Sequence, residues 1–342
     1  MTSSNFDEDS FDPAAPAAPG SGIFGMSRKA EDCLVHLIPV PFQATTSYGQ
    51  GTAHGPAAIL TASHQPDLFD IECGRPYESG IVLLPHVDEL HDLNASAEEA
   101  AEIFHEGGEG AEAALEQVNL AGERVNALVR REAKKSLAAG KLVGLVGGDH
   151  ASPFGLIEEL SFRHPGMGIF HIDAHHDLRH AYEGFIWSHA SIMFNVMTQL
   201  DSIAKLVQVG IRDFSEEEKQ MADESEGLIK TFYDRDFSNA QFSGTPFDTI
   251  AGKAIGELPK KVYISFDIDG LDPKLCPNTG TPVPGGFDFN QAMRLISLIT
   301  ESGRTIVGFD LCEVAPGHDE WDANVGARVL YRLIGHMIMS QP

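Results

Sequence analysis

Cysteine is scarce in this 342-residue sequence, and each of its four occurrences stands alone. Cys33, Cys73, Cys276 and Cys312 form none of the paired spacings that are typical of a zinc site or of a disulfide framework. We therefore expect four free thiols in a reducing compartment, which predicts a cytoplasmic protein.

Long apolar runs and basic residues are also lacking. No stretch of the sequence reaches the roughly 18 apolar residues that a membrane span needs, and no basic segment followed by an apolar one opens the chain. The 24 Lys and Arg are outnumbered by 50 Asp and Glu, which gives a formal net charge of −26. This charge argues against nucleic-acid and acidic-membrane partners, and its field would attract a cationic substrate.

Two segments differ in composition from the rest of the chain. Residues 1–22 mix Ser, Asp, Pro, Ala and Gly, which predicts a disordered N-terminal arm. Residues 94–120 are acidic and low in complexity, and we interpret them as an insertion beside a long helix that ends near Ala139. The sequence shows no internal repeat, so we expect a single domain over residues 23–342.

Short apolar runs bounded by Gly, Pro or Asp predict the strands. They are continuously apolar, as in strands covered on both faces, and helical patterns separate most of them. The predicted strands are 35–40, 80–85, 142–148, 167–173, 206–211, 228–233, 262–269 and 305–311. The predicted helices include 56–63, 153–162, 190–200, 289–301 and 324–339, besides the long one. The pattern favours an α/β fold with a parallel sheet between two layers of helices.

The segment "DAHHD" ends the fourth predicted strand and carries the most distinctive chemistry. Asp173, His175 and Asp177 occupy alternate positions, so an extended chain would point all three to one side. These side chains could bind one ion or two neighbouring ions. Chance, or the capping of a strand end, would explain this pattern if it stood alone.

Two other strand ends repeat the design. "GGDH" places His150 after the third predicted strand, and we expect its paired glycines to allow a sharp turn. "DID" places Asp267 and Asp269 at alternate positions after the seventh, although aspartates there could simply cap turns. Because ligands of open parallel sheets bind beyond the carboxyl ends of the strands, the three segments can converge.

Four carboxylates and two imidazoles exceed what one ion needs unless it is six-coordinate, and carboxylates gathered without a counter-ion would repel one another. They suit two divalent ions about 3.5 to 4 Å apart, which share a water molecule that loses a proton near neutral pH and attacks the substrate. Oxygen-rich ligation without thiolate favours Mn²⁺, while the imidazoles also admit Ni²⁺ or Co²⁺.

Two further residues are candidates for catalysis. His189, in "WSHAS", is the best-placed proton donor for an amine leaving group, although a lone histidine is more often a surface or supporting residue. Glu313, in "FDLCEVAP" after the last predicted strand, could accept hydrogen bonds from a planar guanidinium. The alternative for Glu313 is a solvated loop glutamate.

Three ordered motifs of the sequence resemble the metal-binding signatures of the ureohydrolases, the family of arginase, agmatinase and formiminoglutamase. They are "GGDH" at 147–150, "DAHHD" at 173–177 and "SFDIDGLDPKLCPNTGTPVPGG" at 265–286, and the likeness extends over about residues 33–339. The resemblance implies the arginase-like fold, a three-layer α/β/α arrangement around an eight-stranded parallel sheet. It also implies a dinuclear manganese centre that cleaves a guanidino or formimino C–N bond.

The resemblance further implies a role for each candidate residue. One ion would be held by His150, Asp173, Asp177 and Asp267, and the other by Asp173, His175, Asp267 and Asp269. His189 would be the proton shuttle and Glu313 the partner of the guanidinium group. The family also implies a homotrimer or homohexamer.

The substrate stays open within the family. Arg179 stands where arginases carry an asparagine, which makes arginine a doubtful substrate, and it could bind a substrate carboxylate or pair with Glu183. The "SHAS" and "DIDGLDP" segments look closer to agmatinase-like proteins, and an acidic protein suits a small cationic guanidino compound. The alternatives are formiminoglutamate, with release of formamide, and guanidine or a biguanide.

Two hypotheses other than a ureohydrolase have less support in the sequence. A dinuclear phosphoesterase would normally surround its phosphate with Arg or Lys, and Arg179 is the only basic residue inside these clusters. A non-catalytic subunit, which assembles with a paralogous catalytic one, would be expected to have lost a metal ligand or Glu313. All of these residues are present in the sequence.

Overall fold

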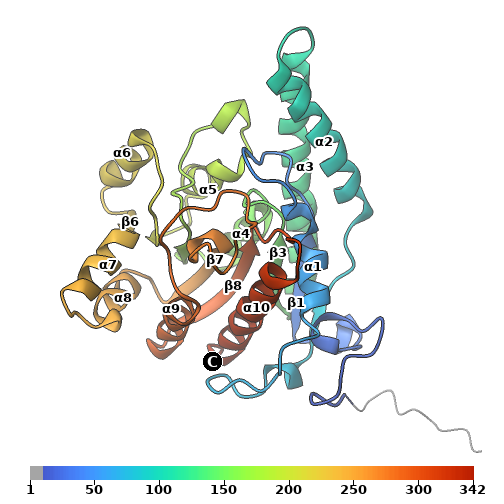
Figure 1. The fold of residues 1–342 in the computed structure, drawn as a ribbon, viewed down its shortest axis with the longest axis vertical. Helices are drawn as coiled ribbons and strands as arrows, with labels where there is room; N and C mark the ends of the chain where they lie inside the picture. Colours follow the sequence, from blue (N-terminus) through green and yellow to red (C-terminus); the bar gives the residue numbers. More distant parts are fainter. Residues whose placement is uncertain (1–10) are drawn as a thin grey trace, which may run out of the picture.

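The computed structural model describes residues 11–342, and a parallel sheet of eight strands lies at its centre (Figure 1). The order across the sheet is β2-β1-β3-β8-β7-β4-β5-β6. The strands are β1 (Val35–Val40), β2 (Ile81–Leu83), β3 (Leu142–Gly147), β4 (Gly168–Ile172), β5 (Lys205–Val209), β6 (Ile229–Phe232), β7 (Lys261–Asp267) and β8 (Thr305–Cys312). Each lies within or close to an apolar run of the sequence, which confirms the predicted strands and fold class.

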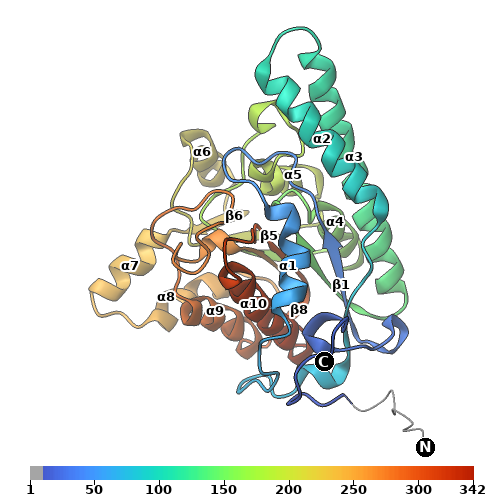
Figure 2. The same ribbon diagram turned by 45° about the vertical axis from the view of Figure 1, so that its right-hand side comes forward.

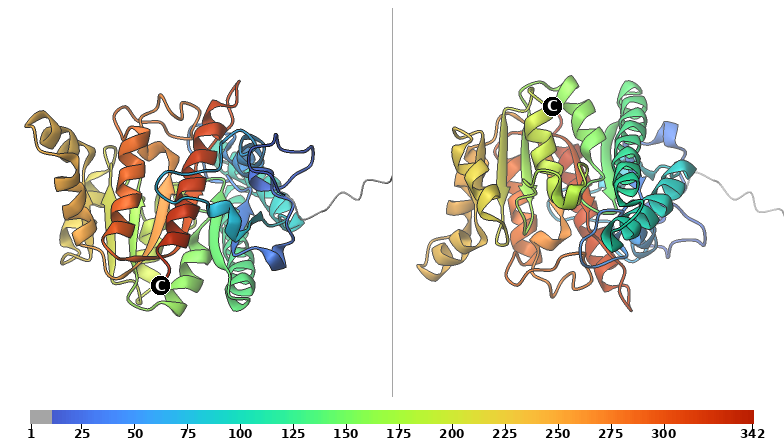
Figure 3. Two further views of the ribbon diagram at one scale, coloured as in Figure 1. Left: turned by 90° about the horizontal axis from the view of Figure 1, so that it is seen from below. Right: turned by 90° about the horizontal axis from the view of Figure 1, so that it is seen from above.

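Helices cover both faces of the sheet, as the two panels of Figure 3 show. One apolar core joins the sheet to α1 (Gly55–Ala62), α7 (Asp234–Phe242), α8 (Phe247–Gly256), α9 (Phe289–Glu301) and α10 (Trp321–Met339). The other joins it to α2 (Asp88–Glu106), α3 (Ala111–Ala138), α4 (Phe154–Arg163), α5 (Ile192–Gln199) and α6 (Glu216–Glu224). The strands are continuously apolar because both of their faces are buried. Among residues 11–342, no helix combines the length and apolar character that a membrane span requires.

The strand order places a crevice at the carboxyl edge of the sheet. β3 and β4 follow one another in the chain, but β8 and β7 lie between them in the sheet. The chain therefore crosses over two strand positions after β3. The loops after β3 and β4 lead to α4 and α5 in one core, whereas those after β7 and β8 lead to α9 and α10 in the other. Parallel α/β sheets bind their ligands at such a switch of strand order.

The two segments of unusual composition differ in structure. Residues 1–10 of the predicted N-terminal arm lie outside the described residues. Within the described part of the arm, the ring centroid of Phe11 lies 5.9 Å from that of Tyr77. The acidic segment 94–120 belongs to an antiparallel helical hairpin, formed by α2 and α3, that projects beyond the sheet (Figures 1 and 2). Its turn contains Gly107, Gly108 and Gly110, all at positive φ, which explains why a glycine-rich sequence interrupts the helical pattern.

The hairpin also contacts two loops at the carboxyl edge. Asn94 of α2 accepts a hydrogen bond from the backbone N–H of Gln43, at 2.8 Å, and Asn119 of α3 accepts one from the N–H of Ile186, at 2.7 Å. Phe185 is buried against alanines of both helices. The acidic insertion therefore holds the loop after β1 and the loop that leads to His189.

Gly122 of α3 lies where the hairpin meets this second loop, and we predict that Gly122→Ala destabilises the protein. A Cβ atom at Gly122 would lie 2.7 Å from the Cβ of Trp187, so the loop must shift, at a cost of about 1–3 kcal/mol for overpacking. Gly252→Ala in α8 is the matched control, because nothing lies within 4 Å of its added Cβ. Urea denaturation should show a lower midpoint for Gly122→Ala and an equal or higher one for Gly252→Ala, and equal midpoints would contradict the packing described here.

Candidate metal centre

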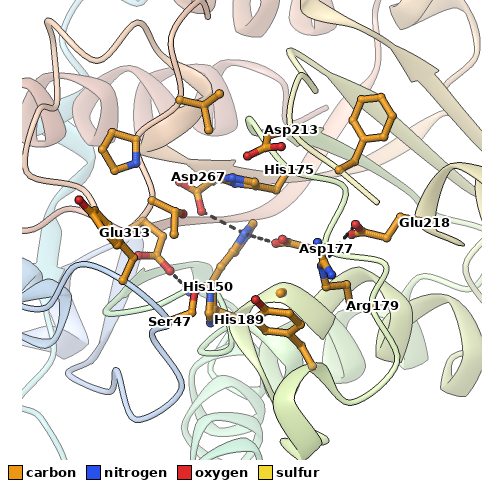
Figure 4. Close-up of a pocket in the computed structure, with 17 residues that line it drawn as sticks. Ser47, His150, His175, Asp177, Arg179, His189, Asp213, Glu218, Asp267 and Glu313 are labelled. Atoms are coloured by element: carbon orange, nitrogen blue, oxygen red, sulfur yellow. Dashed lines mark hydrogen bonds and ion pairs between the residues drawn. The ribbon is translucent and has the colours of Figure 1, made fainter. Parts of the chain in front are cut away.

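A pocket of about 300 Å³ opens at the carboxyl edge of the sheet, where the ends of β3, β4, β5, β7 and β8 meet two surface loops (Figure 4). Its lining is rich in ionisable and aromatic side chains and has few aliphatic ones. The lining residues include Ser47, Tyr48, His150, His175, Asp177, Arg179, Tyr182, His189, Asp213, Phe214, Glu218, Asp267, Thr281, Val283 and Glu313.

His150, after β3, forms the centre of a first group of ligands. Its Nδ1 lies 2.9 Å from Asp177 Oδ2, 3.1 Å from Asp173 Oδ2 and 3.3 Å from Asp267 Oδ2. All four side chains are buried, yet Nδ1 has no hydrogen bond of suitable geometry with any of these oxygens. The opposite ring nitrogen, Nε2, lies 2.9 Å from the hydroxyl of Ser265. An imidazole nitrogen faced by three carboxylates fits the ligand set of a divalent cation.

His175 and Asp269 form a second group, which shares Asp173 with the first. His175 Nδ1 lies 3.1 Å from Asp269 Oδ2 and 3.4 Å from Asp173 Oδ1. Short backbone contacts hold the carboxylates in place: Asp173 accepts from the N–H of His175, and Asp267 from the N–H of Asp269. The ligand atoms of Asp173, His175 and Asp269 lie within 4.8 Å of one another, so this group could also hold an ion.

Burial makes the ionised form of these carboxylates energetically unfavourable unless a cation is bound. Burial, followed by the nearby Asp173, raises the pKa of Asp177 to about 6. Burial and the charges of Asp269 and Asp173 likewise raise the pKa of Asp267 well above its usual range. Neutralisation by bound cations would relieve both the desolvation and the mutual repulsion. The donor set of aspartates and imidazoles therefore fits a pair of divalent ions.

The structure brings together all six residues that the sequence proposed as metal ligands, from three strand ends that are far apart in the chain. The chain bends at Gly148 and turns at His150, but it does so without the left-handed conformation that glycine favours. Neither Gly147 nor Gly148 has a positive φ. Instead, a Cβ atom would lie 2.5 Å from Cys312 Sγ at Gly147 and 2.1 Å from the carbonyl oxygen of Phe42 at Gly148, so both glycines serve close packing.

Glu313 lies beside the first group and is not a solvated loop residue, because its side chain is buried. Oε1 accepts a hydrogen bond from the backbone N–H of His150 at 2.9 Å, whereas Oε2 has no partner. Burial, together with the charge of Asp149, raises the pKa of Glu313 well above its usual range.

Glu313 has φ +65° and Asp177 has φ +55°, a conformation that side chains other than glycine adopt at a cost. Ala181 and Glu183, in the loop that contributes Tyr182 to the pocket, also have positive φ. Such strain is typical of functional sites, where the surrounding structure maintains an unfavourable backbone.

His189 lines the same pocket as Glu313 and stands at the start of a short 3-10 turn (Figure 4). Its backbone N–H donates to Thr45 Oγ1 at 3.1 Å, and Thr45 in turn donates to Asp149 Oδ2 at 3.1 Å. The ring atom Nδ1 is buried without a partner. Burial lowers the pKa of His189 to about 4, so its imidazole is neutral at pH 7.

Arg179 does not pair with Glu183, which contacts His105 instead. The Nε of Arg179 lies 3.4 Å from Glu218 Oε2, and its guanidinium lies 4.7 Å from the centroid of the Tyr182 ring. Glu218 and Ser215 form the capping box at the start of α6. The "SEEE" segment at 215–218 carried a signal for this helix start, but nothing local in the sequence indicated its contact with Arg179.

The sequence analysis also missed a buried histidine beside the ligands. His171 Nε2 lies 2.8 Å from Asp173 Oδ2. Its position two residues before Asp173 on β4 was a signal, because alternate residues of a strand share a face. The four cysteines are free thiols, as expected.

Comparison with known proteins relates the whole domain to one family. A sequence model of the arginase family matches residues 34–336. The N(1)-aminopropylagmatine ureohydrolase of Thermus thermophilus is 31% identical over 306 residues, which cover 89% of this chain and 90% of that protein. An agmatinase of Bacillus anthracis is 30% identical over 298 residues, covering 85% and 87%. The agmatine ureohydrolase structure from Thermoplasma volcanium shares the fold, with a TM-score of 0.69 at 23% identity, covering 91% and 92% of the two chains.

If the buried carboxylates require cations, Mn²⁺ should stabilise the protein against heat. Binding at a hundredfold excess over the dissociation constant adds about 2.7 kcal/mol per site, so the melting temperature should rise with Mn²⁺ and fall after chelation. Asp267→Asn should lose most of this response. Asp201→Asn should keep it, because Asp201 is exposed in the turn before β5, at the amino edge of the sheet, and does not line the pocket. A melting temperature of the wild-type protein that is insensitive to Mn²⁺ would contradict the assignment.

Proposed function

The chain belongs to the arginase family, and we propose that it hydrolyses the guanidino C–N bond of a small, cationic, agmatine-like compound, releasing urea and an amine. The observation that carries the proposal is the buried group of aspartates and histidines at the ends of β3, β4 and β7, with the free carboxylate oxygen of Glu313 beside it. The names of the similar proteins, agmatinase and N(1)-aminopropylagmatine ureohydrolase, support this class of substrate.

We infer that the six clustered residues hold two divalent ions. His150, Asp173, Asp177 and Asp267 would hold one, and Asp173, His175, Asp267 and Asp269 the other. The contacts of His150 and of His175 support this division, because each imidazole faces its own subset of carboxylates. The oxygen-rich set favours Mn²⁺, and Ni²⁺ or Co²⁺ would also fit. Such a pair of ions would supply the nucleophile by lowering the pKa of a bound water molecule to near neutrality.

Glu313 would bind the guanidinium group of the substrate. Its Oε2 is buried, faces no partner, and has the planar acceptor geometry that guanidinium N–H groups match. Oε1 is already tied to the backbone of His150, which fixes the carboxylate relative to the proposed ligands. A cation at Oε2 would compensate a carboxylate that burial otherwise destabilises. Glu313 would thereby hold the guanidino carbon at a constant distance from the metal centre.

His189 would supply the proton that the departing amine requires. It lines the same pocket, and its Nδ1 is free of hydrogen bonds within the protein. The neutral imidazole can accept a proton released during attack and return it to the leaving nitrogen. The bonds from His189 through Thr45 to Asp149 fix the backbone from which the ring projects.

The remaining pocket favours a cation over an anion. Among residues 11–342, Arg179 is the only Lys or Arg that lines the pocket, and the carboxylate of Glu218 offsets its charge. Asp213, which is not a proposed metal ligand, adds negative charge to the same pocket. A substrate with a distal ammonium is therefore better accommodated than formiminoglutamate, whose carboxylates would meet this acidic lining. A substrate carboxylate at Arg179 would have to share the guanidinium with Glu218.

Two alternatives to an agmatine-like substrate and a catalytic role are kept. Guanidine or a biguanide would fit the same centre while leaving the distal part of the pocket unused. In the other class of rival, the chain is a non-catalytic subunit that needs a paralogous partner, and the intact ligand set and Glu313 argue against it. We also propose a homotrimer or homohexamer, the assembly that membership of this family implies.

A panel of guanidino compounds tests the proposal. Purified protein should be loaded separately with Mn²⁺, Ni²⁺ and Co²⁺ and assayed for urea release from agmatine, guanidinobutyrate, arginine, guanidine and a biguanide, and for formamide release from formiminoglutamate. We expect an agmatine-like cation to have the highest kcat/KM. Preference for formiminoglutamate would overturn the substrate assignment, and metal-loaded protein without activity on any of these compounds would favour the non-catalytic subunit.

We predict that His189→Ala reduces kcat by about 10²–10⁴, the usual contribution of a positioned proton donor, without loss of bound metal. His180→Ala is the matched control, because His180 is an exposed histidine of the same loop region and should retain wild-type kcat. Metal content is measured on the same samples. Parallel losses of metal and of activity in His189→Ala would show that His189 has a structural role instead.

A further inference from the structure

A line of buried side chains leads from Asp173 into the protein interior. His171 Nε2 lies 2.8 Å from Asp173 Oδ2, and His171 Nδ1 lies 3.0 Å from the Nε2 of Gln208 on β5. The Oε1 of Gln208 lies 2.7 Å from Nδ1 of His176. All four side chains have 0% exposure, so water does not compete for these contacts. Every donor in the line must therefore be matched to an acceptor within the line.

The backbone fixes the direction of these hydrogen bonds. The Nε2 of Gln208 also lies 2.8 Å from the carbonyl oxygen of His176, and a carbonyl oxygen can only accept. The amide NH₂ of Gln208 therefore donates to this carbonyl and to His171 Nδ1. Its Oε1 accepts from His176 and from the hydroxyl of Thr231, at 3.3 Å. Because a neutral imidazole carries one N–H, His171 holds its proton on Nε2 and donates it to Asp173.

This direction decides what His171 can do. By distance alone His171 is a candidate metal ligand, since it lies within 4.8 Å of the ligand atoms of His150, Asp173 and Asp177. A nitrogen that carries a proton has no lone pair for a metal, and the other nitrogen, Nδ1, faces Gln208. His171 is therefore a hydrogen-bond donor to a carboxylate rather than a ligand.

We propose that His171, held by Gln208, is a positioning residue that orients the carboxylate of Asp173 toward both metal ions. Asp173 is the residue shared by the two groups: Oδ2 faces His150 at 3.1 Å, and Oδ1 faces His175 at 3.4 Å. The N–H of His171 holds Oδ2 while the backbone N–H of His175 holds Oδ1, so rotation of the carboxylate is blocked from both ends. The inference rests on the proposed dinuclear centre. Hydrogen-bond partners of metal ligands commonly contribute 10- to 100-fold to metal affinity.

The alternative is that His171 merely fills space in the core, and two variants separate the two roles. His171→Leu removes the donor and keeps an apolar side chain of moderate size. His171→Gln can present an N–H close to the place of Nε2. The control is His36→Leu, which removes another buried histidine, one that contacts Ser136 and the carbonyl oxygen of Ala30 outside the pocket.

The measurement is Mn²⁺ affinity, by electron paramagnetic resonance of free Mn²⁺ during titration of the metal-free protein, together with the melting temperature of each metal-free protein. We expect His171→Leu to weaken binding about 10- to 100-fold and His171→Gln to recover most of the loss. Gln208→Met should weaken binding in the same direction by a smaller factor, since it removes the group that fixes the tautomer. His36→Leu should bind Mn²⁺ as the wild-type protein does.

Wild-type affinity in His171→Leu would overturn the inference, and so would an equal loss in His171→Gln, because the N–H would then be irrelevant. If metal-free His171→Leu melts at a lower temperature, Gln208→Met decides: weaker binding with unchanged melting supports the positioning role, and unchanged binding overturns it. Absence of Mn²⁺ binding by the wild-type protein would instead contradict the proposed metal centre itself, so the two failures are distinguishable.

Discussion

The concentration of buried negative charge at one edge of the sheet is the constraint on which the rest of the structure depends. Within residues 11–342, Asp173, Asp177, Asp267 and Asp269 lie near three imidazoles, the hydroxyl of Thr281 and a few backbone N–H groups, and no Lys or Arg pairs with them. Burial of carboxylates is tolerated only when they are paired, protonated or bound to cations. Buried carboxylates would destabilise an ordinary core, but here they form a site that can bind cations.

The fold meets this constraint by dividing the carboxylates among different strands. The end of β3 contributes one proposed ligand, that of β4 three and that of β7 two, and the loops beyond the strands add Glu313 and His189. The backbone strain at Asp177 and Glu313 is maintained by packing from both faces of the sheet. The α2–α3 hairpin supports the loops that close the pocket, through Asn94 and Asn119. A segment that its composition marks as an insertion thus becomes part of the frame of the site.

The sequence sufficed for the strands and the proposed ligands because both depend on local patterns. Continuous apolar runs mark strands buried on both faces, and Asp or His at alternate positions after such runs marks a shared direction. The contacts between Arg179 and Glu218, and between His171 and Gln208, could not be predicted, since they join strands or loops whose register only the folded sheet defines. The close approach of Phe42 and Cys312 to the paired glycines before His150 could not be predicted either, because it is a tertiary contact. Likewise, the acidic, alanine-rich composition of residues 94–120 indicates a helix, but it does not indicate which loops that helix contacts.

The central claim is that three strand ends together form one dinuclear site, and anomalous diffraction from crystals grown with Mn²⁺ tests it most directly. Data collected on either side of the manganese absorption edge identify the element and its position independently of any assay. The account predicts two manganese peaks about 3.5 to 4 Å apart, between the imidazoles of His150 and His175 and in contact with Asp173 and Asp267. A single peak, peaks elsewhere on the acidic surface, or no peak at the carboxyl ends of β3, β4 and β7 would contradict it.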